Sequence, residues 1–89
     1  MNLGILGRDP AVLARAMQLA ARHGHVPQGT LRDADALAWV QQGSIEGLVI
    51  GGGVEPAPRR ALLDACRARG VRPIEVFGPE NLDHALGAL

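Results

Sequence analysis

The stretch Gly47-Leu48-Val49-Ile50-Gly51-Gly52-Gly53 joins an uninterrupted apolar run to three successive glycines, and a helical pattern follows it. An apolar run of this kind predicts a strand that is covered on both faces, at the centre of a parallel sheet. Because glycine has no side chain, glycines between such a strand and the next helix let main-chain N–H groups approach an anionic ligand. The stretch therefore predicts a parallel α/β fold and a candidate site at the end of one strand.

Strand and helix patterns alternate along the rest of the chain. The predicted strands cover Asn2 to Gly7, His25 to Thr30, Gly47 to Gly51 and Arg72 to Phe77. The predicted helices cover Pro10 to His23, the segment around Leu37 to Val40, about Pro58 to Arg69, and a last segment that begins at Pro79. Strict alternation implies a parallel sheet with right-handed crossovers and helices on both faces.

Residues with strong positional preferences mark the ends of these helices. Asp9 is suited to cap the first helix, which then begins at the proline after it. Thr30 and Asp33 resemble a capping pair for the second helix. Gly43 and Gly70 are expected to end the second and third helices.

Two prolines predict the order of the strands. Proline cannot donate to a sheet ladder, so Pro27 and Pro73 place the second and fourth strands at the two edges. We therefore expect one domain over residues 1–89, a three-layer αβα sandwich around a four-stranded parallel sheet of order 2-1-3-4. In that order the winding reverses between strands one and three, and the ligand crevice lies at their carboxyl ends, in loops 7–9 and 51–55.

Composition limits the partners and the location. The 89 residues hold nine basic and nine acidic side chains, and this zero net charge offers no general attraction for nucleic acid or a membrane surface. The single cysteine, Cys66, excludes an internal disulfide and is expected to be buried in the third helix. Since neither a signal peptide nor a membrane-span pattern is present, we expect a cytoplasmic protein. Because small cores gain from association, we also expect a homo-oligomer.

The candidate site combines the main chain of three glycines with the guanidinium groups of nearby arginines. Main-chain N–H groups of the three glycines would form a nest for a phosphate or carboxylate, and nearby arginines would supply positive charge. The expected ligand-binding residues are Gly7, Arg8, Gly51, Gly52, Gly53 and Arg59, with Arg60 as an alternative to Arg59. The same glycines would equally serve a sharp turn that lets strand and helix pack closely, and Glu55 would repel an anion there.

Three segments carry a family resemblance: Gly7-Arg8-Asp9-Pro10, Arg22-His23-Gly24-His25-Val26 and Thr30-Leu31-Arg32-Asp33. With them, residues 1–36 resemble the opening of NAD(P)-binding Rossmann-like reductases, and the predicted alternation resembles small Rossmann-like or flavodoxin-like βα proteins. The resemblance implies NAD(P) as cofactor, with Arg32 meeting the 2′-phosphate of NADP. The glycine finger of that family is degenerate here, because Gly4 and Gly7 are followed by Pro10 in place of a third glycine.

Two functions from different classes remain open. One is a non-catalytic module that binds an anionic or nucleotide ligand on the Gly51–Gly53 loop. The other is a protein-interaction or homodimerisation module that uses an edge strand or the apolar surface around Trp39 and the last helix. No acid, base or nucleophile converges on the crevice, so catalysis is the least supported function. We expect no metal site, since His23 and His25 lack an acid or cysteine at ligand spacing.

Overall fold

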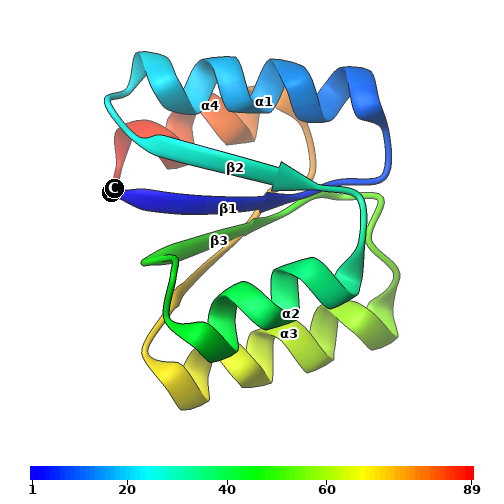
Figure 1. The fold of residues 1–89 in the computed structure, drawn as a ribbon. Helices are drawn as coiled ribbons and strands as arrows, with labels where there is room; N and C mark the ends of the chain where they lie inside the picture. The colour runs from blue at the N-terminus through cyan, green and yellow to red at the C-terminus, as the bar shows by residue number, and fades with distance from the viewer.

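Four parallel strands form one sheet in the order β2-β1-β3-β4, as predicted. The computed structural model describes residues 1–89, with the exception of the Pro79 side chain. The elements are β1 (Asn2–Leu6), α1 (Pro10–Arg22), β2 (Val26–Thr30), α2 (Asp33–Gln42), β3 (Gly47–Ile50), α3 (Pro56–Arg69), β4 (Arg72–Glu75) and α4 (Pro79–Gly87). Figure 1 shows α1 and α4 on one face of the sheet and α2 and α3 on the other, which confirms the three-layer sandwich.

Both edge strands carry a proline. Pro27 of β2 pairs with Leu3 of β1, and Pro73 of β4 pairs with Leu48 of β3. The strands between them, β1 and β3, pair with each other in the middle of the sheet. The reasoning from proline to the strand order is therefore confirmed.

The register brings the carboxyl ends of the strands to one end of the sheet. Leu6, the last residue of β1, pairs with Thr30 of β2 and with Ile50 of β3. Ile50 in turn pairs with Glu75, the last residue of β4. The loops that follow β1, β3 and β4 therefore lie together at the end where the crevice is expected.

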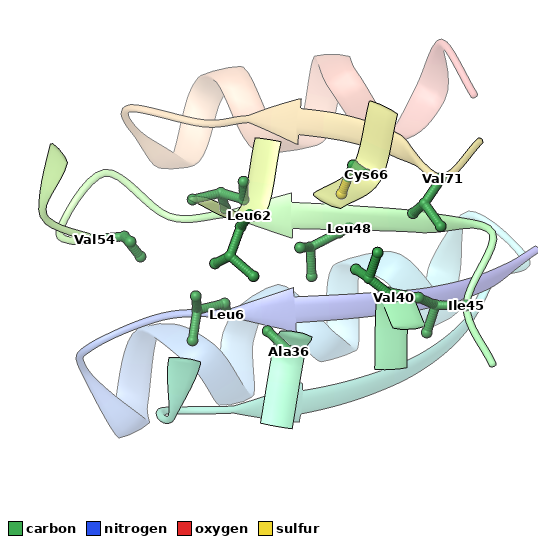
Figure 2. Packing of buried hydrophobic residues seen from close by; sticks show 10 residues of the cluster. Leu6, Ala36, Val40, Ile45, Leu48, Val54, Leu62, Cys66 and Val71 are labelled. Atoms are coloured by element: carbon green, nitrogen blue, oxygen red, sulfur yellow. The ribbon is translucent and has the colours of Figure 1, made fainter. Parts of the chain in front are cut away.

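Successive residues of β3 pack into two different hydrophobic clusters, one on each face of the sheet. Leu48 and Ile50 belong to a cluster packed with α2 and α3, whereas Val49 belongs to a cluster packed with α1 and α4. Figure 2 shows the first cluster, in which Leu62 and Cys66 of α3 lie over the sheet. Cys66 is fully buried, as predicted, and this burial raises the pKa of its thiol. Burial on both faces accounts for the uninterrupted apolar sequence of β3.

Three of the predicted helix ends are confirmed. The Asp9 carboxylate caps α1 by accepting hydrogen bonds from the N–H groups of Ala11 and Val12 at 2.8 and 3.2 Å. The helices α2 and α3 end at Gly43 and Gly70. Their φ values of 70° and 71° lie in the left-handed region that glycine adopts without strain.

The predicted capping pair of the second helix is wrong. Thr30 is still part of β2, and its hydroxyl accepts a hydrogen bond from the Arg32 N–H at 3.0 Å and donates one to Asp35 at 2.7 Å. The residue that precedes the helix is Arg32, whose side chain makes no capping hydrogen bond. Asp33 is the first residue of α2, whereas the acidic member of a capping pair is the third helical residue.

Two other boundaries differ from the prediction by two residues. The helix α3 begins at Pro56 instead of Pro58, because Glu55 has the extended backbone usual before a proline and Pro56 fits the first helical position. The strand β4 ends at Glu75 instead of Phe77, because its partner strand β3 ends at Ile50.

The four helices have nine to 14 residues, and α4 is the shortest. It has nine residues, whereas α1 beside it has 13, which corresponds to lengths of about 14 and 20 Å. Within the described residues, no helix combines the length and the apolar character needed to cross a membrane.

Gly4 of β1 makes room for the side chains that cover the α2 face of the sheet. A Cβ atom at Gly4 would lie 2.9 Å from Trp39 Cε3 and 3.0 Å from Ile45 Cδ1, closer than carbon atoms pack. Trp39 is half-buried against the first cluster, so it does not form the exposed apolar surface expected from the sequence. The large apolar side chains that are exposed in the described residues are Val12, Val26, Leu31 and Phe77.

We expect Gly4→Ala to lower the free energy of unfolding by about 1–3 kcal/mol, the cost of overpacking a filled core. Each 1 kcal/mol lowers the Tm of a domain of this size by about 4–8 °C, which thermal unfolding followed by circular dichroism detects. Gly7→Ala is the matched control, because a Cβ atom there meets only Leu13 Cβ, at 3.9 Å. Its Tm should be unchanged or slightly raised. Equal Tm values for the two variants would contradict the close packing at Gly4.

Candidate functional site

The Gly51–Gly53 loop lies against the backbone of two neighbouring loops. The Gly51 N–H donates to the Leu6 carbonyl at 2.9 Å, and a Cβ atom on Gly51 would lie 3.2 Å from the same oxygen. A Cβ atom on Gly52 would lie 3.3 Å from Phe77 Cα. All three glycines have φ values outside the left-handed region. Close approach of backbone to backbone therefore explains Gly51 and Gly52 without an unusual turn.

Few free main-chain donors remain in this loop and in the helix after it. The Gly51 N–H is occupied within the sheet, whereas those of Gly52 and Gly53 have no hydrogen-bond partner among the described residues. Pro56 and Pro58, in the first turn of α3, have no N–H group. An anion at this loop would therefore meet two glycine donors instead of the expected three.

A cavity of about 380 Å³ opens beside the loop, between α1 and α4. Its floor includes Ile5 of β1 and Val49 of β3, which belong to the second core cluster. Leu13 and Ala16 of α1 and Leu82 of α4 contribute to its walls. The cavity lies on the face of the sheet that α1 and α4 cover, and its volume falls within the range of small-molecule sites.

Four of the six predicted ligand-binding residues line this cavity, namely Gly7, Gly51, Gly52 and Gly53. The other two, Arg8 and Arg59, lie outside its lining, and so does Arg60, which is exposed on α3. The structure thus brings the predicted glycines together at one cavity and separates the predicted arginines from it.

The Arg8 guanidinium connects three segments of the chain. It donates hydrogen bonds to Glu55 at 2.7 and 3.0 Å, to Asp33 at 2.7 Å and to the Leu31 carbonyl at 3.0 Å. The hydrogen bonds with Asp33 and Glu55 raise the pKa of Arg8, and the bond from Arg8 lowers the pKa of Glu55. Arg8 therefore fastens the loop after β1 to the starts of α2 and α3.

The Arg59 guanidinium is enclosed by protein groups as well. It donates to Glu75 at 3.0 Å and to the Gly51 carbonyl at 2.6 Å, and it lies 5.2 Å from the centre of the Phe77 ring. Its side chain is only 13% exposed. Arg8 and Arg59 together face three carboxylates, so their ion pairs leave one negative charge in excess near the glycine loop.

Arg15 of α1 is the one ionisable residue in the described lining of the cavity. It is exposed and has no ion-pair partner among the described residues. Val12 and Leu19 also line the cavity, and their spacing of three and four residues from Arg15 places all three on one side of the helix. Reasoning from the sequence missed Arg15 because it concentrated on the loops, although this helical spacing was available as a signal.

The resemblance to NAD(P)-binding reductases implies that one basic residue, Arg32, contacts the 2′-phosphate of NADP. Arg32 directly precedes α2, is exposed, and lies outside the lining of the cavity. Its N–H group donates to the Thr30 hydroxyl. Comparisons of the chain with models of protein families, with curated proteins and with solved structures found no match.

We expect the ion pair between Arg8 and Glu55 to stabilise the fold at neutral pH and not in acid. The pKa of Glu55 lies below its ordinary value of 4.5 in the folded chain. The contribution is therefore complete above the unfolded pKa and is lost as the pH falls through the folded pKa. Glu55→Gln should lower the Tm slightly at about pH 7 and leave it unchanged at about pH 2, as thermal unfolding at the two pH values measures.

Arg8→Met provides the matched background for this experiment. Without the guanidinium, Glu55→Gln should change the Tm little at either pH, because the partner charge is gone. A Tm difference that persists in acid or in the Arg8→Met background would show that Glu55 stabilises the fold through another contact.

Proposed function

We propose that this chain is a non-catalytic binding module whose small-molecule ligand occupies the cavity beside the Gly51–Gly53 loop. The observation that carries the proposal is the place of the cavity at the carboxyl ends of β1 and β3, between which the sheet order 2-1-3-4 changes winding direction. Open parallel α/β sheets bind their ligands in this crevice. A mostly apolar lining with a few polar groups is also usual for small-molecule sites.

The polar groups at the cavity favour an anionic group on the ligand. Gly52 and Gly53 have N–H groups without partners among the described residues, and Arg15 lies in the same lining. A guanidinium keeps its proton at neutral pH, so Arg15 is suited to hold an anion and not to transfer a proton. The resemblance of the first 36 residues to reductases implies a nucleotide, NAD(P), and nucleotides are therefore among the probes of the binding experiment below.

A second function, association with another copy of the chain, is favoured by exposed apolar side chains at the same cavity. Phe77 and Val12 are 72% and 60% exposed, and both belong to the lining. Removing such side chains from water favours association. This surface, in place of the expected one around Trp39, is then the proposed interface of a homodimer.

Filling the cavity should abolish ligand binding. Ala16 lines the cavity and is 5% exposed, whereas Ala14 is exposed and lies outside the lining. We expect at least one of four probes, inorganic phosphate, ADP, NADP and octanoate, to raise the Tm by about 6–11 °C at roughly ten times its Kd. Ala16→Leu should remove this rise, and Ala14→Leu, the matched control on the same helix, should retain it.

The thermal-shift series separates the alternatives. If none of the four probes raises the Tm of the unmodified chain, the proposed binding function is wrong. A rise that Ala16→Leu retains would place the ligand outside the cavity.

Self-association is tested by sedimentation velocity over a range of protein concentrations. If the surface around the cavity forms a dimer, Phe77→Ser should raise the dimer Kd by about tenfold or more, because an aromatic contact at the centre of an interface is lost. Val26→Ser is the control, since Val26 is 65% exposed on β2 and outside the cavity lining. A monomer at every concentration, or a larger effect of Val26→Ser, would contradict this interface.

A further inference from the structure

We infer that the ligand of this cavity is an amphipathic monoanion, a hydrocarbon chain that ends in one carboxylate, and that Arg15 binds the carboxylate. The inference rests on the proposed binding function and specifies its ligand class. It combines three observations: the charge balance at the glycine loop, the apolar lining of the cavity, and an arginine at the cavity without an internal partner.

The charge balance disfavours a ligand with several negative charges. Arg8 and Arg59 are paired with three carboxylates, of which Glu55 and Asp33 lie at the starts of α3 and α2. A polyphosphate would need several donors and a surplus of positive charge. The loop offers it two free glycine N–H groups and a helix start with two prolines. A ligand with a single negative charge does not require several donors or a surplus of positive charge.

The lining suits a hydrocarbon better than a sugar or a base. Ile5 and Val49 on the floor are 3% and 2% exposed, and Leu82 on the wall is 6% exposed. Ribose hydroxyls placed among such side chains would lose water without gaining hydrogen-bond partners, which is unfavourable. Phe77 and Val12, both exposed, extend the apolar surface outward from the cavity. A chain longer than the cavity would therefore stay in contact with apolar groups.

Arg15 supplies the charge that the apolar walls lack. A planar guanidinium binds a carboxylate through two parallel hydrogen bonds. Because Arg15 has no ion-pair partner among the described residues, a ligand carboxylate need not displace an internal one. Val12 and Leu19 lie one turn away on either side, so the charge and the apolar contacts lie on the same side of α1.

Isothermal titration calorimetry on the 89-residue chain tests the ligand class with octanoate, hexanoate and octanol. Octanoate should bind roughly 15-fold more tightly than hexanoate, because each buried methylene contributes about fourfold to the affinity. Arg15→Gln should weaken octanoate binding about three- to tenfold and leave octanol binding unchanged. Arg22→Gln is the matched control, since Arg22 is exposed on the same helix and outside the cavity lining, and it should change neither affinity.

The outcomes distinguish this inference from the function on which it rests. If octanoate and octanol bind equally, or if Arg15→Gln leaves octanoate binding unchanged, the inference is overturned and a binding cavity remains. If phosphate, ADP or NADP binds and octanoate does not, the inference is overturned and the proposed anionic ligand remains. If no probe binds, both proposals fail.

Discussion

The central strand β3 is buried on both faces. Its neighbouring residues Leu48 and Val49 are 0% and 2% exposed, and they belong to hydrophobic clusters on opposite faces of the sheet. Side chains alternate between the faces of a strand, so neither face of this sheet can be left to water. Strict alternation of strands and helices meets this requirement, because it delivers two helices to each face. The helices that cover the sheet run from nine residues in α4 to 14 in α3. The cavity lies on the face to which the shortest helix belongs.

The groups that hold the loops together also determine the character of the cavity. Arg8 fastens the loop after β1 to two helix starts, and Arg59 fastens the glycine loop to β4. Each arginine is satisfied by carboxylates and carbonyl oxygens, so its charge is used within the fold. The glycines permit this close packing, and they contribute backbone to the cavity wall. Packing of the loops thus leaves an apolar cavity with Arg15 as its ionisable group.

Local patterns predicted the fold well, because each strand and most helix ends depend on nearby residues. The apolar run of β3, the prolines of the edge strands and the glycines after α2 and α3 each indicated the right structure. The side-chain partners of the site depend on distant residues instead. Arg8 binds Glu55, 47 positions away, and neither residue type reveals that pairing in the sequence. The same limit applies to the exposure of Phe77 and to the contacts that half-bury Trp39, since both depend on the packing of whole elements.

Pro27 and Pro73 also influence how copies of this chain meet at high concentration. A proline in an edge strand stands where an N–H group would otherwise face solvent, so a strand from another molecule finds an interrupted row of donors on either side. Continuous growth of a cross-β fibre requires that row to be complete. Each edge of the sheet is thereby a poorer template for a strand of a second copy.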